Sequence, residues 1–397
     1  MTNQTNYLME TYKRLPVSFE KGEGVWLFDK NGNKYLDALS GIAVNTLGHN
    51  HPDLIKAITT QVSKLIHVSN YYNIEEQSLL AEKLVNFSKL SSVFFCNSGC
   101  EANEAAIKMA RLHANKLNID NSNIIVMEGG FHGRTMGTLS ASAGRNYQAG
   151  FEPLVSGFIR VPFDDIDAIS NITSKKNKVS AIFVEPIQGE GGIKIPQEFE
   201  QYLKKLRKIC DENNWLLIFD EVQCGIGRTG KWFAHQHSSI KPDVMTLAKG
   251  LGSGVPIGAC IANETASQLM QPGKHGSTFG GNPLACAAGI TTLNIIEDKS
   301  LAKNATKQGL LITKFLTEKL KNNKHVVSIR SLGLMIGIEL SLPCVEIVNI
   351  ALEKKLLINV TSGNVIRLLP PLTINETETK VLCERLINVI NIFLNNL

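Results

Sequence analysis

From about residue 93 the chain repeats one pattern that limits its possible folds more than any other feature. Short apolar runs each end in a polar or glycine-rich turn, and a helical stretch follows. The runs are Val93–Cys96, Ile124–Met127, Ala181–Val184 and Leu216–Phe219. Strands that alternate with helices in this way form a parallel sheet with helices packed on its faces. The sequence therefore predicts an α/β fold.

Two stretches between these runs have helical periodicity. After Glu101, alanine or methionine recurs at positions 102, 105, 106, 109 and 110, the i, i+3, i+4, i+7, i+8 spacing of one helix face. We expect this helix to pack a narrow, small-residue face against the sheet. A second helix between Glu198 and Asn213 is expected to link two strands.

The two ends of the chain depart from this pattern. Asn31-Gly32 lies between apolar-rich runs in Val25–Asp37 and predicts an antiparallel hairpin whose two central residues take positive φ. The tail from about residue 297 is rich in Lys and Leu, has long helical periodicity and then contains Asn364–Pro371. It resembles a smaller α+β domain.

Composition excludes several classes of protein. The 397 residues provide two to three domains of about 150 residues each. With 43% hydrophobic and 19% charged residues, the chain is neither disordered nor fibrous. Its 41 Lys and Arg against 36 Asp and Glu leave +5, too small a surplus to indicate nucleic acid or an anionic membrane as partner.

The cysteines and the N-terminus bear on location. Eight cysteines without C-x2-C spacing predict neither a zinc ribbon nor a redox dithiol and suit a reducing compartment. Residues 1–30 lack an apolar leader, and apolar stretches such as Trp215–Phe219 are far short of the roughly 18 residues of a membrane span. We expect a cytoplasmic protein without a transmembrane segment. His49-Asn-His51 has no third ligand spaced with it, so we expect no metal.

The first stretch that carries chemistry is Ser98-Gly99-Cys100, between a strand and a helix. The first amides of a helix lack intrahelical partners and favour anions. Ser98 adds a hydroxyl, and Gly99 lets the backbone approach a phosphate. A simple strand-to-helix cap is the alternative.

The second stretch places Asp220 and Glu221 directly after an apolar strand, at the edge where open α/β sheets bind ligands. An Asp at that edge can meet a cationic nitrogen of a ligand, although a solvated pair of acids would look the same. The strand 181–184 also ends in an acid, before a glycine-rich loop that carries Glu190. We expect residues at the ends of these two strands to line the same cleft.

The third stretch ends an apolar run with Lys249, just before Gly250 and Gly252. Partial desolvation would lower the pKa of this lysine and suit it to imine formation. A solvated surface lysine is the ordinary alternative.

Two loops complete the set. Phe131 could stack on a flat heterocycle and Arg134 could bind a carboxylate. Taken alone, Phe131 is more typical of a hydrophobic core and Arg134 of the protein surface. Ser277 and Thr278 lie in a glycine-rich loop that suits a phosphate or a plain turn. A phosphate cradle, an acid, a lysine, a ring and an arginine together describe a pyridoxal phosphate site.

Read in order, these stretches resemble the class III pyridoxal phosphate aminotransferases over nearly the whole chain, and within them the acetylornithine aminotransferases. The matching segments are LSGIAVNTLGHNHP, FFCNSGCEANEAAIKMAR, FHGRT, VEPIQGEGG, FDEVQCGIGRTG, LAKGLG and HGSTFGGNPLACAAG. The resemblance implies the type I aminotransferase fold, with a mostly parallel central sheet, helices on both faces and a smaller α+β domain. It also implies a homodimer with active sites at the interface. We expect an N-terminal part of the small domain at 1–55, a large cofactor domain at 56–290 and the C-terminal small domain at 291–397.

The resemblance also assigns residues to the cofactor. Lys249 corresponds to the lysine that binds it covalently and moves the substrate proton, and Asp220 to the partner of the pyridine nitrogen. The remaining expected contacts are Phe131 and Val222 on the ring faces, Gln223 at the phenolic oxygen, Ser98, Gly99 and Cys100 at the phosphate, and Thr278 at the phosphate from the other subunit. Glu221 is also expected to bind the cofactor, with no particular atom assigned to it. Cys100 departs from the usual Thr or Ala, which puts a side-chain hydroxyl contact in doubt.

Substrate contacts follow from the same resemblance. Arg134 would bind the α-carboxylate of the amine donor, Arg367 the carboxylate of 2-oxoglutarate, and Ser277 would lie near the substrate. Glu190 resembles a gate that pairs with Arg367 while the donor is bound and moves aside for the dicarboxylate.

Ile42 bears on the choice of donor. Related ornithine aminotransferases typically carry Tyr at this position, and an apolar side chain tolerates an acylated nitrogen better than a charged one. The expected reaction is transfer of the terminal amino group of N2-acetylornithine to 2-oxoglutarate, as in arginine biosynthesis. Succinyl-diaminopimelate, succinylornithine or ornithine as donor, an aminomutase and a non-enzymatic binding protein remain alternatives.

Overall fold

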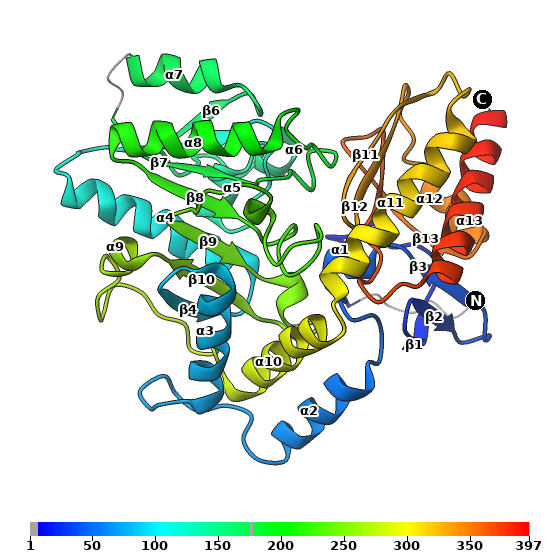
Figure 1. Ribbon diagram of the computed structural model, residues 1–397, viewed down its shortest axis with the longest axis horizontal. Coiled ribbons are helices and arrows are strands. Elements are labelled where there is room, and N and C mark those ends of the chain that lie inside the picture. The colour runs from blue at the N-terminus through cyan, green and yellow to red at the C-terminus, as the bar shows by residue number, and fades with distance from the viewer. Residues whose placement is uncertain (1–6, 175–177, 397) are drawn as a thin grey trace.

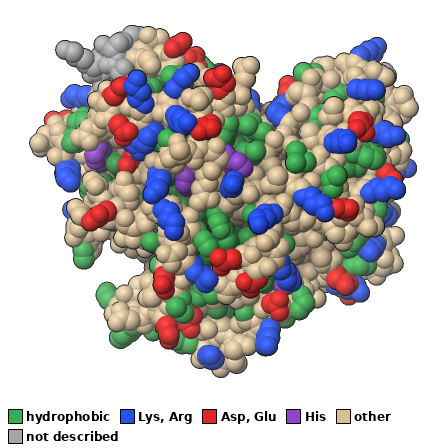
Figure 2. Space-filling model, in the orientation of Figure 1, with side chains coloured by type: hydrophobic (Ala, Val, Ile, Leu, Met, Phe, Trp, Pro, Cys, Tyr) green, Lys and Arg blue, Asp and Glu red, His purple; other side chains and the backbone are tan. Residues whose placement is uncertain are grey.

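The computed structural model describes residues 7–174 and 178–396. Figure 1 shows a larger region built around a central sheet and a smaller region in which the two ends of the chain meet. Over the face visible in Figure 2, acidic and basic side chains are interspersed, in keeping with the near balance of charge. Among the described residues, no helix is both long and apolar enough to cross a membrane.

The central sheet has the strand order β4-β10-β9-β8-β7-β5-β6. Neighbours from β9 to β6 pair in parallel, whereas β10 runs antiparallel to both β9 and β4. All four apolar runs predicted as strands form β4, β5, β7 and β8. The bounds are β4 Ser92–Cys96, β5 Asn123–Met127, β6 Phe158–Val161, β7 Val179–Val184, β8 Leu216–Asp220, β9 Val244–Leu247 and β10 Gly258–Ala262.

Alternate residues of each central strand face opposite layers of helices. Phe183 and Ile218 pack against α4 (Gly99–Lys116), which buries Ala102, Ala105, Ala106, Met109 and Ala110 as predicted. Val184 and Leu217 belong to the opposite layer, which contains α7 (Ile166–Ser174) and α8 (Phe199–Asn213). By the same alternation, Asp220 at the end of β8 faces α4.

Further helices surround the large region. α2 (Pro52–Val62) and α3 (Glu75–Ser88) both pack on α10 (Pro283–Asp298). Shorter elements near the sheet edge are α5 Met136–Ala141, α6 Arg145–Gln148, α9 Glu264–Ser267 and the 3-10 turns η1 Ala234–His237 and η2 Lys249–Leu251. The boundaries expected after residues 55 and 290 fall inside α2 and α10, and the three-part division stays a prediction.

The N-terminal hairpin forms, with a different turn. β1 (Phe19–Glu23), β2 (Trp26–Asp29) and β3 (Lys34–Asp37) are antiparallel, and β13 (Leu356–Leu357) joins β3 from the other end of the chain. Gly32 takes φ of 78°, but Asn31 is not left-handed, contrary to the prediction. Asp29 explains the difference, because its Oδ1 accepts from the amides of Asn31 and Asn33, both at 2.9 Å.

The C-terminal tail forms the predicted α+β arrangement. Its sheet has the order β11-β12-β15-β14, and all of its pairs are antiparallel. The strands are β11 Val326–Leu332, β12 Met335–Leu340, β14 Asn359–Thr361 and β15 Val365–Leu368, and the helices are α11 Leu301–Leu320, α12 Ile347–Glu353 and α13 Glu376–Asn395.

Candidate active site

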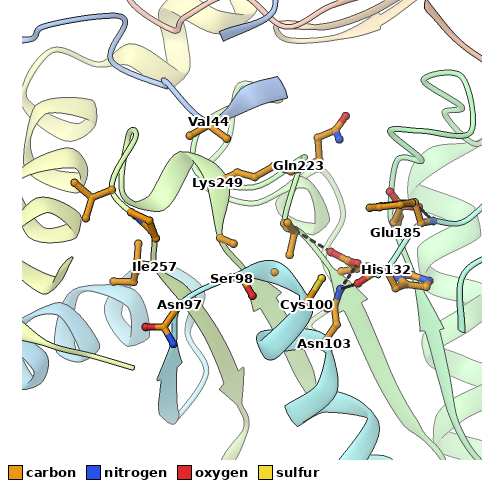
Figure 3. Close-up of a pocket in the computed structure, with 18 of the residues that line it drawn as sticks. Val44, Asn97, Ser98, Cys100, Asn103, His132, Glu185, Gln223, Lys249 and Ile257 are labelled. Carbon is orange, nitrogen blue, oxygen red and sulfur yellow. Dashed lines mark hydrogen bonds and ion pairs between the residues drawn. The ribbon is translucent and has the colours of Figure 1, made fainter. Parts of the chain in front are cut away.

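A cavity of about 350 Å³ opens at the carboxyl edge of the central sheet. Its walls come from the start of α4, the ends of β7 and β8, the loop after β5 and the segment after β9. Figure 3 shows Lys249 reaching over Ser98 and Cys100 into this space. The predicted residues that line it are Ser98, Gly99, Cys100, Phe131, Asp220, Val222, Gln223 and Lys249.

Asp220 is held by hydrogen bonds on both carboxylate oxygens. Its Oδ2 accepts from Asn103 Nδ2 and from His132 Nδ1, each at 2.8 Å, and its Oδ1 accepts from the Val222 amide at 3.0 Å. Asn103 is oriented in turn, because its Oδ1 accepts from the Thr246 hydroxyl at 2.6 Å. Donors to both oxygens hold the carboxyl group in one orientation. The structure thus fixes a carboxylate at the wall of the cavity.

His132 and a second buried acid, Glu185, line the cavity near Asp220. Its ring stacks on Phe183 at 4.1 Å, and its Nε2 has no hydrogen-bond partner among the described residues. Glu185, directly after β7, accepts from the amides of Phe131 at 2.9 Å and Gly189 at 3.1 Å. Burial raises the pKa of Glu185 to about 7.

Lys249 is a lysine that lines the cavity. Burial lowers its pKa, and the nearby positive charge of Arg367 acts in the same direction, whereas Glu190 and Asp220 oppose it. Its backbone is left-handed, with φ of 41°. The lowered pKa agrees with the expectation from the sequence and increases the fraction of neutral amine.

The start of α4 combines a cap with a close backbone approach. Ser98 Oγ accepts from the Glu101 amide at 3.2 Å, so the capping interpretation is correct as well. A Cβ on Gly99 would lie 2.8 Å from Val222 Cγ1, so any side chain at this position would displace Val222. Cys100 Sγ accepts from the Arg134 amide at 3.3 Å, so the thiol supports the neighbouring loop.

Phe131 and Arg134 are placed differently. Phe131 lines the cavity and meets Tyr147 edge-on at 5.9 Å. The guanidinium of Arg134 lies over the Tyr147 ring at 4.1 Å and is exposed, outside the set of residues that line the cavity. Its proposed contact with a carboxylate therefore requires a substrate that extends beyond this cavity.

Glu190 and Arg367 form an ion pair, Nη1 to Oε1, at 2.6 Å. Arg367 is fully buried on β15, while the Glu190 side chain keeps 24% of its surface exposed. Arg367 Nη1 also donates to Gln223 Oε1 at 3.2 Å. Two residues 177 positions apart thus meet as the expected gate requires.

Besides Arg134, Glu190 and Arg367, four further expected residues lie outside the set that lines the cavity, namely Glu221, Ile42, Ser277 and Thr278. Glu221 follows the last residue of β8, and its side chain is not among those that line the cavity. Its carboxylate instead accepts from the amides of Ala234 and His235 and from His235 Nδ1. The structure thus contradicts the expectation that the Glu221 side chain faces the cofactor cavity.

Ile42 belongs to the turn Ser40–Ala43 (α1), in which every residue has positive φ. A β-branched residue in this conformation is strained.

Ser277 and Thr278 border a separate hollow of about 740 Å³, which His67 and Tyr71 also line. Thr278 is exposed, as a residue that serves another subunit would be in a single chain.

Asn103, His132 and Glu185 line the cavity but were not predicted as site residues. Asn103 and Glu185 each carried a signal in the sequence. Asn103 lies three and seven residues before Ala106 and Ala110, on the buried stripe of its helix, and Glu185 ends a strand just as Asp220 does. Among the described residues, no group of three or more His, Cys, Asp or Glu side chains could hold a metal ion.

Comparisons with known proteins identify the family of the chain. Residues 7–390 match the family described as aminotransferase class-III. An acetylornithine aminotransferase from Nitrosomonas europaea is 56% identical over 94% of this chain and 95% of its own length.

Two solved structures extend the comparison. An N-acetylornithine aminotransferase from Stenotrophomonas maltophilia has a TM-score of 0.85 at 34% identity, covering 97% of this chain and 98% of its own. An ornithine aminotransferase from Toxoplasma gondii, described with partial occupancy of PLP at its active site, has a TM-score of 0.93 at 33% identity, covering 98% and 93%. Similarity of fold therefore does not discriminate between the two donors.

Proposed function

The chain belongs to the class III aminotransferases, and from this premise we propose that it transfers the terminal amino group of N2-acetylornithine to 2-oxoglutarate. The products would be N-acetylglutamate 5-semialdehyde and glutamate. One observation carries the proposal: a single cavity brings together Lys249, the anchored carboxylate of Asp220 and the amide-rich start of α4.

The residues of this cavity fit pyridoxal 5'-phosphate. The amides of Gly99 and Cys100 lie in the first turn of α4, where they lack intrahelical partners, and therefore suit a phosphate. Phe131 and Val222 provide apolar surface for a ring, and Gln223 provides an amide for its phenolic oxygen. When bound, the cofactor supplies an electron sink for the carbanion formed at the substrate carbon.

The chain's own residues perform the acid–base work. Asp220 would hold a positive charge at the ring nitrogen, and Asn103 and His132 orient its carboxylate. Lys249 accepts a proton at Nζ and returns it to the product, for which a lowered pKa is favourable. The apolar walls exclude water and strengthen these interactions.

Arg367 and Glu190 serve two substrates in turn. With Glu190 paired, the positive charge of Arg367 is masked, and the carboxylate of the amine donor binds elsewhere, at Arg134 in our proposal. When the Glu190 side chain moves aside, Arg367 becomes available to the distal carboxylate of 2-oxoglutarate.

The choice of amine donor is supported by the apolar side chain of Ile42 and by the relatives of the chain. An apolar residue favours an acylated nitrogen over a charged amine. The cited curated relative at 56% identity is an acetylornithine aminotransferase, whereas the ornithine aminotransferase structure is 33% identical. These identities favour acetylornithine over ornithine.

We propose that the enzyme is a homodimer in which Thr278 and Ser277 of each chain complete the other subunit's site. Exposed apolar side chains surround this loop, with Tyr71 at 95% and Phe279 at 61% exposure. A second copy of the chain would cover them. The expected cytoplasmic location is supported by the eight cysteines, all of which are free.

The test is glutamate formation from 2-oxoglutarate with acetylornithine, succinyl-diaminopimelate, ornithine and 4-aminobutyrate compared side by side. We expect acetylornithine to have the highest kcat/KM. Product from ornithine but not from acetylornithine would overturn the donor assignment, and turnover without 2-oxoglutarate would instead indicate an aminomutase.

A further inference from the structure

The short edge strand β14 faces both partners of the Glu190–Arg367 ion pair. Asn359 and Thr361 are two residues apart in this strand, so their side chains project from the same face. Asn359 stands directly opposite Arg367 in the pairing of β14 with β15. Cross-strand neighbours of this kind have their side chains within contact distance.

Asn359 orients the guanidinium of Arg367. Its Oδ1 accepts from Nε at 3.1 Å, while Nη1 donates to Glu190 and Gln223. Nη2 has no hydrogen-bond partner among residues 7–174 and 178–396, although Arg367 is fully buried. Asn359 is neutral, so it fixes the rotation of the guanidinium without compensating its charge.

Thr361 holds the backbone of the opposite partner. Its hydroxyl donates to the Glu190 carbonyl oxygen, which also accepts from Ser362 Oγ at 3.3 Å. Arg330 on β11 clamps the same loop further along, since its Nε donates to the Ile193 carbonyl at 2.8 Å. The backbone of the loop is thus tied to the C-terminal sheet, and only the Glu190 carboxylate is free to rotate.

We propose that β14 is the positioning element of this ion pair, with Asn359 and Thr361 as residues that determine selectivity between the dicarboxylic oxo acid and the amine donor. The proposal rests on the proposed function. Because one strand holds both partners, the gate opens by side-chain rotation and closes again at the same distance. A charged side chain at Asn359 would pair permanently with Arg367 and compete with the incoming carboxylate.

Asn359→Asp in the holoenzyme tests the first half, because the two side chains have the same size. We expect the KM for 2-oxoglutarate to rise by about tenfold or more. The half-reaction with acetylornithine, followed by absorbance, should stay within about twofold of wild type. Binding of glutarate, a dicarboxylate that cannot react, should weaken by a similar factor in calorimetry.

Thr361→Val and Thr361→Ser test the second half. Valine removes the hydroxyl at constant shape, and we expect the ratio of the KM for 2-oxoglutarate to the KM for acetylornithine to change by about threefold or more. Serine restores the donor and should restore the ratio. Asn364→Ala is the matched control, because Asn364 donates to Leu340 in the same sheet at 2.9 Å without touching the ion pair.

The outcomes separate this inference from the proposed function. A wild-type enzyme that does not use 2-oxoglutarate would refute the proposed function, while the glutarate measurement would still test Asn359. An Asn359→Asp enzyme with unchanged KM and unchanged glutarate affinity would refute the inference. Equal losses in both half-reactions, or the same ratio change in Asn364→Ala, would reduce β14 to a structural role.

Discussion

His132 Nδ1 donates to Asp220 Oδ2 at 2.8 Å, with both side chains buried. A carboxylate only accepts hydrogen bonds, so the pairing places a proton on Nδ1 of the imidazole. The stack of His132 on Phe183 fixes the plane of the ring as well. Asp220 is therefore positioned by residues that do not themselves need to touch the substrate.

Replacing His132 by Leu should impair both stability and turnover. Asp220 Oδ2 would lose one of its two donors in a buried setting, which costs about 1–3 kcal/mol of unfolding free energy. We expect a lower melting temperature and a kcat reduced by about tenfold or more. His132→Asn, which keeps a donor, should recover part of both. Wild-type kinetics in His132→Leu would contradict a positioning role.

Lys249→Ala should reduce glutamate formation by at least about a thousandfold, because the residue is the proposed proton carrier. Circular dichroism should show an unchanged fold, since removing a partly desolvated amine relieves an unfavourable burial. The exposed Lys231 provides a matched control, and Lys231→Ala should keep wild-type rates. Substantial activity in Lys249→Ala would remove this lysine from the mechanism.

The sequence predicted those parts of the site that depend on local pattern. Strand ends place Asp220 and Lys249 at one edge because parallel strands share a direction. Glu221 could not be placed in this way, since its direction depends on where the strand alternation ends. The Asn359–Arg367 contact could not be predicted from the sequence either, because it depends on the register of two strands in the C-terminal sheet.

The N-terminal turn shows the same limit at a smaller scale. The Asn31-Gly32 pair correctly predicted a hairpin, but the conformation was decided by Asp29, whose carboxylate binds two amides of the loop. Hydrogen bonds from a side chain to the backbone compete with the intrinsic preferences of the turn residues.

Gly99→Ala should weaken cofactor binding more than folding. A Cβ at this position would lie 2.8 Å from Val222 Cγ1 and push that side chain toward the cavity. We expect the dissociation constant for pyridoxal phosphate to rise by about tenfold, equivalent to about 1.4 kcal/mol. Titration of the cofactor-free protein, followed by fluorescence, measures this.

The double variant Gly99→Ala/Val222→Ala provides the control for this collision. It should bind the cofactor no more weakly than Val222→Ala alone, because the steric conflict is gone. Additive losses in the double variant would show that Gly99 acts through something other than contact with Val222.

Glu185 should make stability depend on pH. Burial raises the pKa of its carboxyl to about 7 in the folded protein, above the unfolded value near 4.5. The neutral acid therefore contributes stability that is fully present below pH 4.5 and is lost as the pH rises through about 7. Glu185→Gln removes this titration.

The measurement is the melting temperature of both cofactor-free proteins between pH 5 and pH 8.5. We expect wild type to lose stability relative to Glu185→Gln as the pH increases, by up to about 3 kcal/mol over the whole range. A difference between the two proteins that does not change with pH would mean that Glu185 is ionised throughout.

The shared site can be tested by complementation. Thr278→Asp should prevent phosphate binding by charge repulsion while leaving the fold intact, because Thr278 is exposed in a single chain. Co-expression of Thr278→Asp and Lys249→Ala chains with two different tags allows purification of mixed dimers only. If Thr278 serves the partner's site, each mixed dimer has one fully wild-type site and should show about half of the wild-type activity. If it serves its own chain, every site carries a defect and the mixed dimers stay inactive.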